Sequence, residues 1–203
     1  MLRVCPAMPG APPQSEEEPG PMDFDDTIVT RQAPPSAIDS EVLREVARYW
    51  LSLRGERPWP SRGEIDPLDL KPRIWPSLWI VDCEDPEAGR FRFRLAGEAV
   101  NRSFGQVVRG CTLEDLFAPK ARTPVARRFR QVADAGVACH CEGTVYVENE
   151  GSGWGERLIL PLGEDANAVT HLFGVTVAEY RSLQPDEVSR PCVQESFFPL
   201  DVL

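Results

Sequence analysis

The chain has no apolar run that approaches the ~20 residues a membrane-spanning helix needs. Its N-terminus places one arginine, Arg3, before proline, glycine and glutamate, and so lacks the apolar segment of a signal peptide. Basic residues are also fewer than acidic ones: the chain has 22 Lys and Arg and 32 Asp and Glu, which gives a net charge of −10. Binding driven by phosphate neutralisation is therefore not expected. These absences predict a cytoplasmic protein that binds neither membrane nor nucleic acid.

The sequence also lacks the short motifs that mark common enzyme classes. It contains no GxSxG, P-loop, HExxH or dinucleotide-binding fingerprint. The glycine-rich residues 151–155 do not lead from a strand into a helix, so they are not expected to cradle phosphate. We predict a protein that is not an enzyme and has no catalytic residues.

No CxxC spacing occurs among the six cysteines. In a cytoplasmic chain we expect reduced thiols, several of them buried. The run Cys139-His140-Cys141 is the pattern most suggestive of a metal site. Because side chains alternate along a strand, its thiols should share one face and its imidazole should lie on the other, so we predict no metal site. A metal sensor, or a haem sensor using His140 or His171, is kept as an alternative, and the cofactor is left undetermined.

Composition divides the chain into a tail, a body and a second tail. Residues 1–39 hold eight of the twenty prolines and an EEE run, which predicts a disordered acidic tail. All three methionines lie there, and a start at Met22 would leave residues 1–21 untranslated. Residues 40–180 carry the patterns of a folded domain. Residues 181–203 are weakly patterned and are expected to form a C-terminal tail that docks on the body, on a partner or not at all.

The clearest strand pattern is RFRFRLAG at residues 90–97, where Phe91, Phe93 and Leu95 alternate with arginines. We expect these three side chains to face a helical layer and the arginines to face the opposite side. Four more strands are predicted over residues 77–83, 137–147, 154–162 and 169–178. Short loops join the last three of these, which favours an antiparallel meander.

Helical periodicity marks two longer segments. Apolar residues recur every three or four positions over residues 42–53, and Gly55 then provides a stop. Thr123 predicts the start of a second helix and Gly136 its end. A short helix is expected over residues 98–104. Two strands, a helical crossover and three strands is the element order of a PAS domain.

Several short motifs make this likeness more specific: Tyr49-Trp50, Arg54-Gly55, Pro60-Ser61-Arg62, Ile65-Asp66-Pro67, residues 78–82 and 91–97, Phe104-Gly105, Gly110 and Leu160-Pro161-Leu162. With them, the chain resembles a PAS-like family of small stand-alone proteins common in alphaproteobacteria, over about residues 40–180. The resemblance implies an α+β fold, a five-stranded antiparallel sheet with helices on one face. The amphipathic N-terminal helix would lie outside that unit and cover the other face or mediate a homodimer. The resemblance implies a sensory role and carries over no catalytic residue.

A ligand pocket is expected between the sheet and the helices. Its predicted lining is apolar: Trp79, Val81, Phe93, Leu95, Leu160 and Phe173 from strands, and Phe104, Leu116 and Phe129 from helices. The alternative is that these side chains only pack a core.

Arg94 and Gly97 form the second candidate set. Arg94 is expected to pair with a carboxylate of the N-terminal helix or of the Ile65-Asp66 segment, and anion recognition is the alternative. Gly97 is expected to permit a sharp turn at the end of its strand.

These patterns favour a non-catalytic sensory or regulatory domain that binds a small molecule or a signalling protein. A small α+β enzyme with a cone-shaped fold is the second hypothesis, and its pocket would use Asp, Glu or His. The metal or haem sensor is the third.

Overall fold

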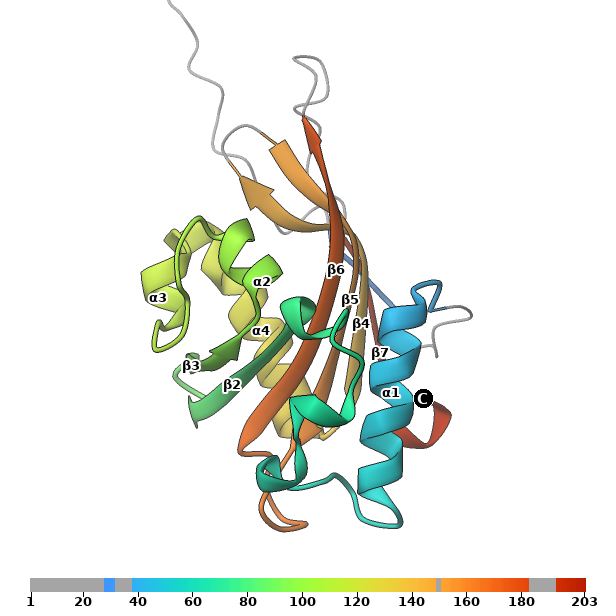
Figure 1. Ribbon diagram of the computed structural model, residues 1–203. Coiled ribbons are helices and arrows are strands. Elements are labelled where there is room, and N and C mark those ends of the chain that lie inside the picture. The colour runs from blue at the N-terminus through green and yellow to red at the C-terminus, as the bar shows by residue number, and fades with distance from the viewer. Residues whose placement is uncertain (1–27, 32–37, 149–150, 183–192) are drawn as a thin grey trace, which may run out of the picture.

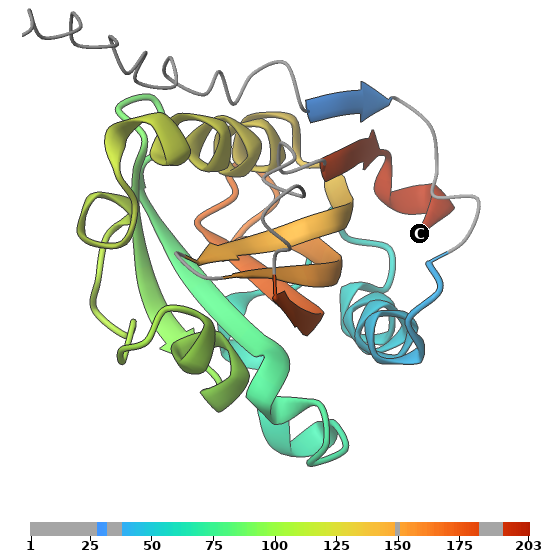
Figure 2. The ribbon, with the colours of Figure 1, turned by 90° about the horizontal axis from the view of Figure 1, so that it is seen from above.

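The computed structural model describes residues 28–31, 38–148, 151–182 and 193–203. In this part of the chain a seven-stranded sheet has the order β1-β7-β4-β5-β6-β2-β3. Its strands are β1 (Ile28–Arg31), β2 (Leu78–Asp85), β3 (Arg90–Ala96), β4 (Ala138–Glu148), β5 (Gly151–Leu162), β6 (His171–Ser182) and β7 (Val193–Phe198). The helices are α1 (Glu41–Arg54), α2 (Glu98–Ser103), α3 (Leu113–Leu116) and α4 (Pro119–Ala135). Figures 1 and 2 show α1 on one side of the sheet and α4 on the other.

The mixed α+β architecture agrees with the prediction, but the predicted count of five strands is wrong. Six strands pair antiparallel, and β1 adds a parallel edge beside β7. The apolar alternation that would mark β7 in the sequence is interrupted by Glu195, which is charged although it is fully buried in the middle of the strand. β1 is only four residues long and lies within the predicted tail. The rest of that tail before residue 38, and residues 183–192, lie outside the described residues.

Helix α1 covers one face of the sheet. The Ser40 side chain accepts a hydrogen bond from the Leu43 amide, and Gly55 ends the helix with φ 57°. Leu43 and Trp50 are fully buried, and the Trp50 indole donates to the Pro161 carbonyl at 3.0 Å. The apolar stripe of α1 therefore packs against the sheet, which is one of the two roles predicted for it.

Helices α2, α3 and α4 form a layer on the opposite face (Figure 1). Phe129 and Val132 of α4 are buried there. α4 begins four residues before the predicted Thr123, because Pro119 takes its first turn. The Thr123 hydroxyl donates to the Pro119 carbonyl at 3.1 Å instead of capping the helix. Gly136 ends α4 in the left-handed conformation, as predicted.

A β-bulge divides β3. Ile80 pairs with Leu95 and Val81 pairs with Phe93, so Arg94 is the extra residue. Phe93 consequently packs in the core under α2–α4, whereas Leu95 packs in the core on the α1 side. The prediction that Leu95 shares the face of Phe93 is therefore wrong, because one inserted residue reverses the alternation.

Among the described helices, none combines the length and the apolar character that crossing a bilayer requires.

Candidate functional site

A small cavity lies between the sheet and the α2–α4 layer. Its volume is about 20 Å³, which is room for about one water molecule. Its walls are mostly aromatic: Trp79, Phe93, Val100, Phe104, Phe117, Val125, Phe129, Tyr146 and Arg157. Trp79, Phe93, Phe104 and Phe129 were predicted to line a pocket here, and the structure brings these four together.

The other predicted lining residues lie elsewhere. Val81 and Leu116 belong to the same core but do not line the cavity. Leu160 and Phe173, with Leu95, lie on the opposite face with α1. Both faces of this sheet are covered, so β5 and β6 are apolar on both faces and alternation alone does not identify the face toward α2–α4.

Trp79 forms the floor of the cavity. It pairs with Gly174 across β2 and β6, and a Cβ on Gly174 would lie 2.1 Å from the indole ring. The ring stacks on Phe129 with centroids 5.5 Å apart, and its Nε1 donates to Thr176 Oγ1 at 3.0 Å. Because Gly174 has no side chain, the indole ring of Trp79 can lie flat against β6.

Phe104 forms the outer wall, just after α2. Its ring meets Phe117 at 5.4 Å, Tyr146 at 5.8 Å and Phe93 at 6.3 Å, each edge to face. These contacts join the short helices α2 and α3 to the sheet across the cavity.

Arg157 of β5 is the polar group of the cavity, and it was not predicted. Its side chain is 9% exposed. Nε donates to Thr176 Oγ1 at 3.0 Å, and Nη2 donates to the Val145 carbonyl at 2.7 Å. The guanidinium also lies 5.1 Å from the centroid of the Tyr146 ring. The sequence held one signal for it. Arg157 alternates with Leu158 along the strand, so it lies on the same face as Ile159, which is buried in the core under α4.

A bulge in β4 prepares this arrangement. Thr144 pairs with Trp154 and Tyr146 with Gly153, so Val145 is the extra residue and its carbonyl is free to accept from Arg157. Tyr146, Phe117, Val100 and Val125 were also missed. The bulge in β4 accounts for Tyr146, whereas Val125 lies one turn before Phe129 on α4, so helical periodicity was an available signal for it.

Buried charges lie next to this site. Glu195 accepts from Arg128 Nε at 2.7 Å and from Arg127 Nη2 at 2.9 Å, and Arg128 Nη2 also donates to it. Arg128 and Glu195 are 5% and 0% exposed, so this is a buried ion pair joining α4 to β7.

The Cys139-His140-Cys141 run has the predicted alternation. The two sulfurs lie 3.7 Å apart in the core under α4, whereas His140 Nε2 lies 2.9 Å from Glu156 Oε2 on the other face. Burial raises the pKa of Cys139 well above its ordinary value. The hydrogen bond from Cys139, and then the charge of Arg128, lower the pKa of Cys141 to about 7. Among the described residues, no three His, Cys, Asp or Glu side chains are grouped as metal ligands.

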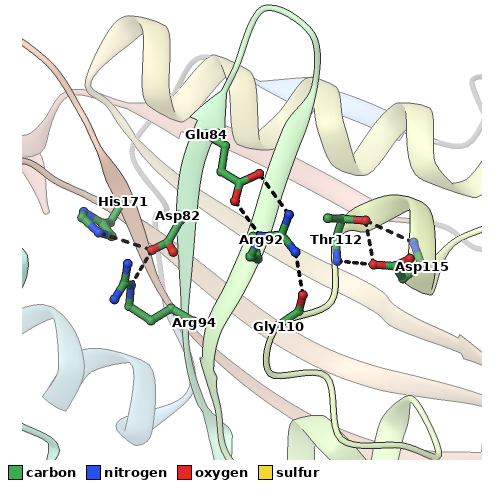
Figure 3. Close-up of polar contacts among 8 residues, drawn as sticks. All are labelled: Asp82, Glu84, Arg92, Arg94, Gly110, Thr112, Asp115 and His171. Atoms are coloured by element: carbon green, nitrogen blue, oxygen red, sulfur yellow. Dashed lines mark hydrogen bonds and ion pairs between the residues drawn. The ribbon is translucent and has the colours of Figure 1, made fainter.

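Arg94 pairs with Asp82, which is neither of its predicted partners. Arg94 Nε donates to Asp82 Oδ1 at 2.6 Å, and His171 Nε2 lies 3.3 Å from the same oxygen (Figure 3). The strand register accounts for this partner, because Asp82 pairs with Arg92 and Arg94 lies two residues further along β3. Burial lowers the pKa of His171, although the charge of Asp82 opposes the effect.

Arg92 ties the edge strand β3 to the loop before α3. Its guanidinium binds Glu84 and donates to the Gly110 carbonyl at 2.8 Å (Figure 3). Thr112 and Asp115 then cap α3 reciprocally. The three arginines of β3 are thus engaged by carboxylates of β2, and none of them lines the cavity.

Gly97 is required for a different reason from the predicted one. Its φ of −73° is ordinary, but a Cβ would lie 2.2 Å from the Trp75 carbonyl oxygen. A close backbone approach, not a turn, excludes larger residues there.

A family model described as a PAS domain matches residues 38–177. The chain belongs to the PAS domain family. The match runs from just before α1 into β6, and so includes every residue of the cavity. No curated protein matches the chain. PAS domains are in general sensory or regulatory domains without catalysis.

Proposed function

We propose that this PAS domain is a non-catalytic sensor that binds a small molecule in the cavity between the sheet and the α2–α4 layer. The observation that carries the proposal is a cavity with aromatic walls and one buried polar group, Arg157. Small-molecule sites are mostly apolar and contain few polar groups, which set the orientation of the ligand.

Binding requires the cavity to enlarge, because about 20 Å³ holds little more than one water molecule. The rings of Phe104 and Phe117 are the movable wall. They follow α2 and α3, which are only 6 and 4 residues long. A ligand that displaces these rings would shift the helical layer relative to the sheet, and that shift is the signal a regulatory partner would read.

The enzyme hypothesis has less support. The residues that line the cavity include no Asp, Glu or His. Glu195, the buried carboxylate among the described residues, is held by Arg127 and Arg128. Of the side chains that ordinarily act as general acids or bases, Tyr146 alone lines the cavity.

Native mass spectrometry of the full chain purified from its own host tests the proposal. We expect a retained small molecule in the wild-type protein. Val100→Leu adds one methylene at the cavity wall and should abolish retention, whereas Val42→Leu makes the same change in α1, away from the cavity, and should preserve it. A wild-type protein that retains no ligand, or loses it equally in both variants, would contradict the proposal.

A further inference from the structure

We infer that the ligand of this cavity is a small aromatic carboxylate and that Arg157 binds its carboxylate group. The inference rests on the proposed function and adds the chemistry of the ligand. It is carried by the position of Arg157, by its lack of a counter-charge and by the rings around it.

The buried charges do not balance. Among the described residues, the buried arginines are Arg128 and Arg157, and the buried carboxylate is Glu195. Both oxygens of Glu195 are taken by Arg127 and Arg128. No described Asp or Glu forms an ion pair with Arg157. A buried cation without a partner is costly, and an anionic ligand would remove that cost.

The guanidinium of Arg157 is held in a fixed orientation. Its Nε donates to Thr176 Oγ1, and its Nη2 donates to the Val145 carbonyl. Its Cζ atom lies over the Tyr146 ring, 5.1 Å from the ring centroid. Both acceptors are neutral, so the positive charge remains, and Nη1 donates to no other described residue. A fixed, planar donor with a free edge is the arrangement that arginine uses to bind carboxylates.

The apolar part of the site favours a flat, aromatic body. Phe93, Phe104 and Tyr146 present ring edges and faces to the cavity, and Trp79 forms its floor. A ligand ring that replaces the Phe104–Tyr146 contact would make the same edge-to-face contacts.

Cys141 is the internal group that competes with this assignment. It lies opposite Arg157 in the β4–β5 register. A Cys141 thiolate would supply a counter-charge without any ligand, although the Cys139 hydrogen bond and Arg128 act on this thiol more strongly than Arg157 does. A Cys141→Ser variant separates the two possibilities.

Isothermal titration of the full chain with matched acids and amides tests the inference. The probes are benzoate with benzamide, and phenylacetate with phenylacetamide. We expect each acid to bind about tenfold or more tightly than its amide, because the amide carries no negative charge to pair with the guanidinium. Arg157→Gln should remove this preference, Arg157→Lys should retain part of it, and Arg127→Gln and Cys141→Ser should leave it intact. The acid–amide comparison on the wild-type protein needs no variant to fold.

The outcomes separate the two claims. Equal binding of acid and amide, or an acid preference that persists in a folded Arg157→Gln protein, would overturn the inference and leave the proposed function standing. An acid preference that appears only in Cys141→Ser and not in wild type would also overturn it, because the thiolate would then be the counter-charge of Arg157. If neither acid nor amide binds while host-purified protein retains a neutral ligand, the inference alone is wrong. If no ligand binds and none is retained, both claims are wrong.

Discussion

The indole ring of Trp79 lies directly against the backbone of Gly174, its partner across β2 and β6. This contact places the ring under the cavity, where it also stacks on Phe129. The residue opposite must have no side chain, because a Cβ there would be 2.1 Å from the ring.

Gly174→Ala should therefore destabilise the protein by about 1–3 kcal/mol, since the ring must leave its rotamer or the strands must separate. Urea unfolding measures the change. Gly63→Ala is the matched control, because its Cβ would have no neighbour closer than 3.9 Å, and it should change stability by less than about 0.5 kcal/mol. Equal stability of the two variants would show that Trp79 is not held against Gly174.

Thr176 accepts hydrogen bonds from two side chains of the site, Trp79 and Arg157. Thr176→Val keeps the shape but leaves both donors without their acceptor, and should cost about 1–3 kcal/mol of unfolding free energy. Thr144→Val is the control, because Thr144 is also buried and its hydroxyl has no hydrogen-bond partner among the described residues. If both valine variants unfold at the same urea concentration, the shared acceptor has no role in stability.

The ion pair between Arg128 and Glu195 is buried on both sides. Glu195→Gln leaves the Arg128 charge in the core without its counter-charge, and should destabilise the chain by about 3–5 kcal/mol. Arg127→Gln removes a partner that is 41% exposed, and should cost less than about 1 kcal/mol. Guanidinium unfolding of both variants makes the comparison, and a Glu195→Gln protein as stable as Arg127→Gln would refute the assignment.

The pKa of His171 predicts a pH dependence of stability. Burial lowers this pKa below its ordinary value of 6.5, with Asp82 opposing the shift. In the window just below 6.5 the unfolded chain binds a proton that the folded chain does not, so this group favours unfolding as pH falls. His171→Gln should therefore reduce the loss of stability between about pH 8 and pH 5. Urea midpoints of wild type and variant measure it, and parallel pH profiles would contradict the shift.

Much of the fold follows from patterns in the sequence, and the exceptions have specific physical causes. The alternation of Phe91 and Phe93 predicts their shared core, and Gly136 predicts the end of α4. The bulge at Arg94 is invisible to periodicity, so the placement of Leu95 was wrong. The buried Glu195 breaks the alternation that would have marked β7, because its compensating charge lies on α4, far away in sequence.

The candidate site was predictable only in part. Aromatic residues at core positions indicated where a pocket would lie, and four of them line the cavity. Arg157 was missed because a charged residue in a strand is ordinarily assigned to solvent. Its burial depends on the Val145 carbonyl, which a bulge on the neighbouring strand provides. Information of that kind appears only when the register of the strands is known.

The most direct measurement of the central claim is a crystal structure of the full chain purified from its own host. We predict density for a small molecule between Trp79 and Phe104, with an anionic group at hydrogen-bonding distance from Arg157 and the Phe104 and Phe117 rings displaced. A closed cavity of about 20 Å³ holding at most a water molecule would contradict the proposed function. Density for a neutral ligand would contradict the role of Arg157 alone.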